Sequence, residues 1–154
     1  MPLHDLISAD AILPHLQAKT KKQALQELSD LAAKVSGLPA REIFDVLLQR
    51  ERLGSTGVGS GIAIPHGKLA RTPKIFGTFA RLETPIAFDS LDGEPVDLIF
   101  MLVAPESAGA DHLKALSRIA RVLRDSALTE RLRHARDSKA IYAMMTAMPT
   151  SHAA

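Results

Sequence analysis

The chain has 154 residues, of which 46% are hydrophobic and 23% charged, and its formal net charge is +2. This length fits one domain with a sizeable core, and the small net charge does not indicate a nucleic-acid-binding protein. The chain has no cysteine, which excludes disulfides, a thiolate nucleophile and a cysteine-based metal site. Its apolar runs, such as residues 98–104, are too short to cross a bilayer. The N-terminus also lacks the pattern of a secretion signal, so we expect a cytoplasmic protein.

Two helices are predicted in the first third of the chain. Residues 20–36 carry apolar side chains at helical spacing, with Thr20 and Gln23 in a capping box and a glycine at the end. A second helix is predicted from Pro39 near its first turn to about Leu53, again followed by a glycine. The apolar positions of the first helix are Leu25, Leu28, Leu31, Ala32 and Val35.

The rest of the chain alternates from strand-like to helical patterns. Strands are predicted at residues 75–82 and 96–104, with a short extended piece at 85–88, and the continuous apolar run 96–104 indicates a strand buried on both faces. Helices are predicted at residues 111–124, 126–135 and 138–148. The buried stripe of the first of these is predicted as Leu113, Leu116, Ile119, Ala120 and Leu123.

The order of these elements predicts an α/β fold, in which helices flank a mixed β-sheet. The sequence contains no internal repeat, no low-complexity linker and no domain break. We therefore predict a single domain over residues 1–149 and a frayed tail at 150–154.

One histidine stands in a chemically suggestive position. A strand-like apolar run, residues 61–64, leads to His66 at a Pro-His-Gly corner, and residues 54–60 just upstream are rich in glycine and hydroxyl side chains. Such a loop can turn backbone N–H groups toward an anion, and a histidine beside it suits phosphoryl transfer through phosphohistidine. The glycine spacing fits neither a P-loop nor a dinucleotide fingerprint. From these residues alone, a plain turn with a satisfied polar histidine remains the alternative.

Basic side chains crowd the C-terminal third of the sequence. We interpret them as the solvated faces of helices, because few aromatic residues are available to stack on bases. A nucleic-acid binder is the alternative, and it would show a steep dependence of affinity on salt. The residues concerned are Lys114, Arg118, Arg121, Arg124, Arg131, Arg133, Arg136 and Lys139.

Several segments together carry a family resemblance. Residues 50–59 and 61–67 resemble the signature of the fructose/mannitol-type enzyme IIA family of the bacterial phosphoenolpyruvate phosphotransferase system. Further similar segments follow in the same order at 85–89, 95–98 and 111–113, so the resemblance covers nearly the whole chain. It implies the mixed-sheet fold of that family and a phosphotransferase component that carries phosphate on a histidine.

The resemblance also implies roles for individual residues. His66 would accept a phosphoryl group from an HPr-like phosphocarrier protein, with Nε2 suggested as the phosphorylated nitrogen, and His112 and Arg50 would stabilise the phosphate. Without the resemblance, Arg50 fits a surface arginine and His112 a polar residue at a helix start. Lys68 is a weaker candidate than Arg50, and no cofactor or metal is expected. The predicted phosphate loop consists of Ser55, Thr56, Gly57 and Gly59.

Residues 92–102 and 116–120 most resemble the nitrogen-regulatory branch of the family. That branch implies a free-standing regulator, without membrane insertion, that binds targets such as potassium-transport components or sensor kinases. Two alternatives stay open: a sugar-specific IIA component that passes phosphate to a IIB domain, and a binding module that is not phosphorylated. The other histidines, expected at the surface, are His4, His15, His134 and His152.

Overall fold

The computed structural model describes residues 3–147, so the predicted tail at 150–154 lies outside the described part. In chain order the elements are a 3-10 helix η1 (Ala9–Ala11), β1 (Ile12–Leu16), α1 (Lys21–Ser36), α2 (Ala40–Leu53), β2 (Gly57–Gly59), β3 (Ile62–Ala63), β4 (His66–Leu69), β5 (Phe76–Ile86), β6 (Val96–Pro105), α3 (Ala110–Arg124), α4 (Ser126–His134) and α5 (Ser138–Thr146).

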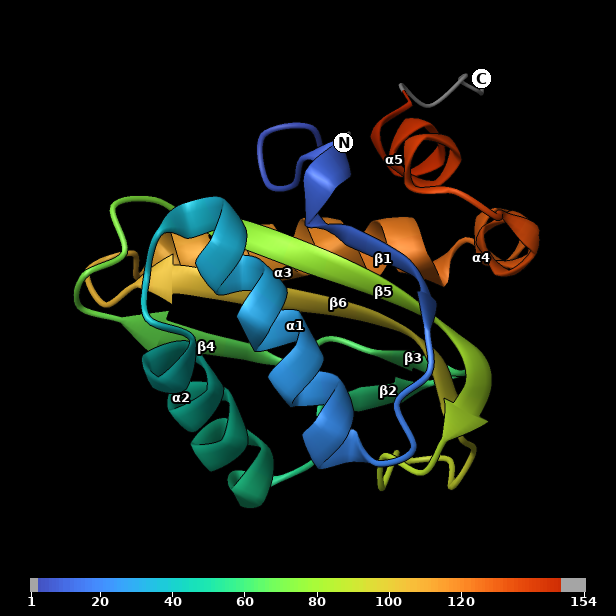
Figure 1. The fold of residues 1–154 in the computed structure, drawn as a ribbon, viewed down its shortest axis with the longest axis horizontal. Helices are drawn as coiled ribbons and strands as arrows, with labels where there is room; N and C mark the ends of the chain where they lie inside the picture. The colour runs from blue at the N-terminus through green and yellow to red at the C-terminus, as the bar shows by residue number, and fades with distance from the viewer. Residues whose placement is uncertain (1–2, 148–154) are drawn as a thin grey trace.

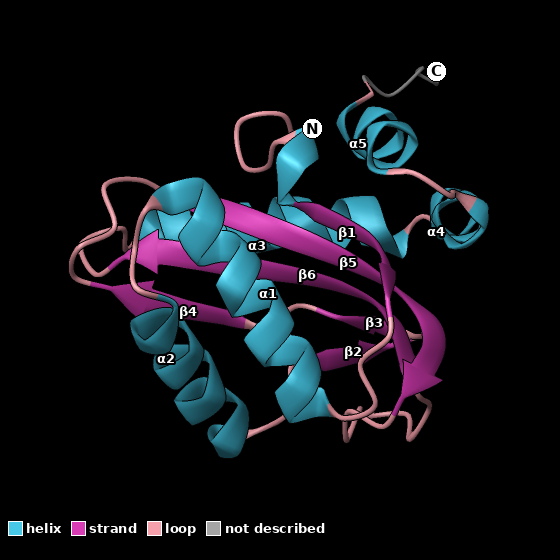
Figure 2. Ribbon diagram, in the orientation of Figure 1, coloured by secondary structure: helices cyan, strands magenta, loops and turns pink. Residues whose placement is uncertain are grey.

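The strands form one mixed sheet of six strands built around β6, in the order β1-β5-β6-β3-β2, with β4 also paired to β6. β5 runs antiparallel to β6, whereas β3 and β4 run parallel to it. β3 pairs with residues 98–99 of β6 and β4 with residues 102–105, so the two short strands follow one another along the same side of β6 (Figure 2). His66 therefore starts a strand that is anchored on the central strand of the sheet.

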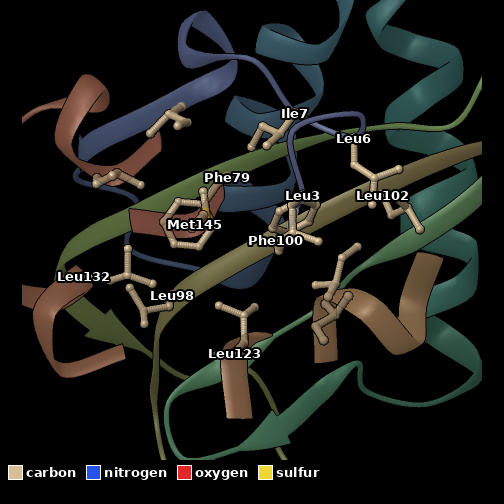
Figure 3. Packing of buried hydrophobic residues seen from close by; sticks show 14 of the residues in the cluster. Leu3, Leu6, Ile7, Phe79, Leu98, Phe100, Leu102, Leu123, Leu132 and Met145 are labelled. Atoms are coloured by element: carbon tan, nitrogen blue, oxygen red, sulfur yellow. The ribbon is translucent and has the colours of Figure 1, made fainter. Parts of the chain in front are cut away.

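Helices cover both faces of the sheet, with α1 and α2 on one face and α3 on the other (Figure 1). Side chains of β6 alternate between the two sides. Leu98, Phe100 and Leu102 join the core beneath α3, α4 and α5, where they pack with the N-terminal residues (Figure 3). The odd-numbered residues between them join the core beneath α1 and α2. This arrangement confirms the predicted strand buried on both faces.

The end signals of α1 are those predicted from the sequence. The Thr20 hydroxyl accepts a hydrogen bond from the backbone N–H of Gln23 at 3.1 Å, and the Gln23 side chain accepts one from the N–H of Lys19 at 2.9 Å. Gly37 ends the helix with φ of 80°, in the left-handed region that favours glycine. Local sequence thus accounts for both ends of this helix.

The structure differs from the sequence prediction at several strands and at one helix position. β1 is not indicated by the sequence, because Pro14 and His15 interrupt its apolar pattern; among the described residues it pairs with β5 alone, and a proline is tolerated at such an edge. β2 and β4 are short strands in segments that the sequence analysis gave as a glycine-rich loop and a Pro-His-Gly corner. β5 is one strand through Pro85 rather than two pieces, with a register shift against β6 after Arg81. Leu113, predicted in the buried stripe of α3, is 68% exposed because the first turn of that helix overhangs an open cavity.

Candidate functional site

His66 is held by a hydrogen bond to the backbone two residues upstream. Its Nδ1 lies 2.9 Å from the carbonyl oxygen of Ile64. Because a carbonyl oxygen can only accept, Nδ1 carries the proton of the neutral ring and donates it to this bond. Nε2 is left with its lone pair, which is the nucleophilic form of the nitrogen. The Ile64 carbonyl thus selects the tautomer and fixes the direction of the ring.

His112 approaches the ring of His66 from the first turn of α3. The two rings meet edge to face, with centroids 5.5 Å apart and an interplanar angle of 86°. His112 is only 6% exposed. Its Nε2 is buried without a hydrogen-bond partner among the described residues. A buried polar nitrogen left unpaired within the protein is available to form a hydrogen bond with a group that enters the site.

The surroundings of both imidazoles lower their pKa values and so favour the neutral rings. Burial is the main factor that lowers the pKa of His66, and the charge of Arg50 lowers it further, against the opposing effects of the Ile64 carbonyl and Glu51. The pKa of His112 is lowered first by burial and then by His66 and Lys68. A neutral His66 retains the Nε2 lone pair at physiological pH.

Arg50 brings a positive charge to the same site from α2. One of its terminal nitrogens donates to the carbonyl of Gly54 at 2.9 Å, which holds the side chain against the end of its own helix. A guanidinium has five N–H donors, so this bond leaves donors available for an anion. Lys68, on β4, also lines the site.

These groups surround an open cavity of about 990 Å³. His66, His112, Arg50 and Lys68 line it together with apolar side chains, among them Leu116. The rim carries two exposed leucines, Leu53 at 86% and Leu113 at 68% exposure. Large apolar side chains exposed together at one site are a feature of surfaces that meet another protein.

The predicted phosphate loop does not line this cavity. Gly57 and Gly59 lie in β2. The Ser55 hydroxyl donates to the carbonyl of Phe88 at 2.6 Å and accepts from the N–H of Gly57 at 3.0 Å. The hydroxyl and backbone N–H of Thr56 both donate to the carboxylate of one buried residue, described below. The hydroxyl groups of this loop are therefore bonded within the protein rather than directed at the histidines.

Glu51 is the residue that receives the bonds from Thr56, and the sequence analysis missed it. Its carboxylate is buried at the end of α2, next in sequence to Arg50. Successive residues of a helix point about 100° apart, so Arg50 reaches the cavity while Glu51 reaches the loop. The only signal in the sequence is an acidic residue five positions before a hydroxyl residue, which is too common to identify such a contact.

Comparison with known proteins places nearly the whole chain in a family. The family described as phosphoenolpyruvate-dependent sugar phosphotransferase system, EIIA 2, matches residues 5–148. The chain belongs to this EIIA family.

Relatives of this EIIA protein point to one branch of the family. The nitrogen regulatory protein of Bradyrhizobium diazoefficiens is 59% identical over 153 residues, covering 99% of this chain and 100% of the relative. That of Escherichia coli K12 is 42% identical over 147 residues, covering 95% and 90%. The crystal structure of nitrogen regulatory protein IIA-Ntr from Neisseria meningitidis is 35% identical, with a TM-score of 0.87 over 92% of this chain and 97% of that chain. The EIIA protein is thus most like the nitrogen-regulatory EIIA proteins.

His4, His15, His134 and Arg133 of the EIIA protein do not line this cavity. His4, His15 and His134 are exposed, and His152 lies outside the described residues. Arg133, one of the C-terminal basic residues, pairs with Asp97 at 2.9 Å. Over residues 3–147, no cluster of three acidic or histidine side chains is suited to hold a metal ion. Nor does that part of the chain contain a helix long and apolar enough to cross a membrane.

Proposed function

We propose that this EIIA protein accepts a phosphoryl group on Nε2 of His66 from an HPr-like phosphocarrier protein and acts as a phosphorylation-dependent regulator. The observation that carries the proposal is the bond from Nδ1 to the Ile64 carbonyl, 2.9 Å long, which leaves Nε2 as the unprotonated nitrogen. The membership of the EIIA family and the similarity to nitrogen regulatory proteins support the same role.

The chemical step follows from this geometry. The lone pair on Nε2 of His66 forms a bond to phosphorus while the bond between phosphorus and the donor atom breaks, and the donor atom keeps the bonding pair. Nδ1 retains its proton, so the Ile64 carbonyl stabilises the positive charge that develops on the ring. Phosphoryl transfer relies mainly on positioning and charge stabilisation. Arg50 would neutralise phosphoryl oxygens through its planar donors, and His112 would donate from Nε2.

The apolar rim supplies a place for the phosphocarrier to dock. Leu53 and Leu113 are both exposed beside the cavity, where a partner could cover them as it delivers its phosphoryl group. Once attached, the group adds a charge of roughly −1.5 to −2. That charge, placed inside the apolar rim, would favour one partner and repel another. Potassium-transport components and sensor kinases in the cytoplasm are the classes of regulated target that we propose.

Reconstitution tests the proposal directly. The protein is incubated with phosphoenolpyruvate, enzyme I and the HPr-like carrier, and the product is measured by intact-protein mass spectrometry and ³¹P NMR. We expect an acid-labile phosphohistidine in the native protein and none in His66→Ala. The absence of an adduct, or an adduct that persists in His66→Ala, would overturn the assignment. Adding a IIB domain to the phosphorylated protein separates the two branches, because only a sugar-specific IIA should transfer its phosphate onward efficiently.

A further inference from the structure

The buried carboxylate of Glu51 is held almost entirely by one residue of the neighbouring loop. Glu51 is 6% exposed. Its two oxygens accept from the backbone N–H of Thr56 at 2.7 Å and from the Thr56 hydroxyl at 2.6 Å. The ammonium group of Lys21 lies farther away, at 3.8 Å, and is nearer to Asp89. A carboxylate that grips a residue at two points fixes its position in the loop.

Thr56 in turn is bonded to the residue that holds His66. Its carbonyl accepts the N–H of Ile64 at 3.0 Å. The carbonyl of the same Ile64 accepts from Nδ1 of His66 at 2.9 Å. A series of hydrogen bonds, joined through the backbones of Thr56 and Ile64, therefore connects the carboxylate of Glu51 to the imidazole ring, and Ile64 is itself buried. Holding the backbone of Thr56 therefore restrains Ile64, and Ile64 in turn restrains the ring.

We infer that Glu51 is a positioning residue for His66, which acts through Thr56 and Ile64 to keep the ring in the Nδ1–H tautomer with Nε2 facing the cavity. The inference rests on the proposed phosphorylation of His66, and it gives the hydroxyl-rich loop a role other than binding phosphate. The loop holds the backbone carbonyl that selects the nucleophilic nitrogen. Glu51 never contacts the phosphoryl group in this account.

The loop provides a matched control for this role. Asp92 also uses its carboxylate to hold backbone near this loop, accepting from the N–H of Ser60 in the following β2–β3 turn at 2.9 Å and from that of Glu94 in its own loop at 3.1 Å. These bonds have no connection to Ile64. Asp92→Ala therefore removes a carboxylate anchor from the turn without interrupting the series that reaches His66.

The test compares Glu51→Gln, Thr56→Val and Asp92→Ala with the native protein. Long-range ¹H–¹⁵N NMR of the unphosphorylated proteins reports which ring nitrogen of His66 carries the proton. Phosphoramidate, a small chemical phosphoryl donor, then gives the rate of His66 phosphorylation by ³¹P NMR. We expect the Nδ1–H tautomer in the native protein and in Asp92→Ala. Glu51→Gln and Thr56→Val should show more of the Nε2–H tautomer and a rate about tenfold lower.

Thr56→Ser retains the hydroxyl that donates to Glu51, so it should show the Nδ1–H tautomer of the native protein. If Glu51→Gln does not fold, the comparison of Thr56→Val with Thr56→Ser still tests the inference. The inference is overturned if Glu51→Gln or Thr56→Val leaves both the tautomer and the rate unchanged, or if Asp92→Ala changes them equally. A native protein that shows the Nδ1–H tautomer but no phosphorylation of His66 by phosphoramidate or carrier would instead contradict the proposed function. The two failures are therefore distinguishable.

Discussion

Replacement of His112 by leucine is expected to leave the protein as stable as before, or more stable. The Nε2 atom of His112 is buried without a partner among the described residues, and an unpaired buried polar group costs about 1–3 kcal/mol. Leucine is similar in size and has no polar atom to leave unpaired. We therefore expect the free energy of unfolding of His112→Leu to be unchanged or about 1 kcal/mol higher. Urea unfolding followed by circular dichroism measures it.

Although its stability should not fall, His112→Leu should accept a phosphoryl group more slowly than the native protein. The ring centroids of His66 and His112 are 5.5 Å apart, so a phosphoryl group on Nε2 of His66 comes within reach of the His112 side chain. A hydrogen bond to a charged group contributes about 1.5–3 kcal/mol, which corresponds to a rate about 10- to 150-fold lower when it is lost. His112→Gln retains a donor and should retain part of the rate. Single-turnover transfer from the phosphorylated carrier, quenched and analysed by intact mass, gives these rates.

The combination of the two measurements decides the role of His112. A gain or no change in stability together with slow transfer is the result expected of a group prepared for phosphate. A loss of more than about 2 kcal/mol in unfolding free energy, with unchanged transfer, would show that His112 is a packing residue and that the reasoning is wrong.

Three further predictions address pH, the loop and the docking rim. Because the pKa values of His66 and His112 are lowered in the fold, the unfolded chain binds more protons, so the unfolding free energy should fall as pH drops below about 6.5. Urea titrations between about pH 5 and 8 should show this slope, and it should be smaller in His66→Gln. A methyl group at Gly57 would overlap the Ser90 hydroxyl. Gly57→Ala should therefore lower the unfolding free energy by about 1–3 kcal/mol. Adding Ser90→Ala should recover part of this loss, and thermal unfolding measures both changes. Leu113→Glu should change stability by less than about 0.5 kcal/mol but raise the carrier concentration that gives half-maximal transfer, and an unchanged value would remove Leu113 from the docking surface.

Elements with complete local signals could be predicted from the sequence. α1 has a cap, a periodic apolar stripe and a glycine stop within one stretch of chain. β6 is a nearly continuous apolar run, which indicates a strand buried on both faces. β1 has no such signal, because the strand it pairs with in the described part of the chain is β5, more than sixty residues farther along. Its pairing depends on contacts that no local pattern encodes.

At the candidate site, prediction from the sequence fails for a different reason. Periodicity identifies the apolar positions of α3 but not which of them overhang a cavity, so Leu113 was wrongly placed in the core. The composition of residues 54–60 indicates groups that can bind an anion, but not whether the protein itself already uses them. Glu51, which uses two of them, is recognisable only once the end of α2 and the loop are placed side by side.

The unphosphorylated site is already arranged by backbone carbonyls before any phosphate arrives. The carbonyl of Ile64 directs the imidazole of His66, and the carbonyl of Gly54 holds the guanidinium of Arg50. These two contacts lie on either side of the residue that Glu51 holds, so the segment 54–64 carries the backbone carbonyls that contact both His66 and Arg50. Because phosphoryl transfer depends chiefly on positioning and on charges fixed in advance, loosening the segment should affect both together. In the proposed function the adjacent residues Arg50 and Glu51 would therefore have different roles, with Arg50 supplying charge and Glu51 holding the geometry.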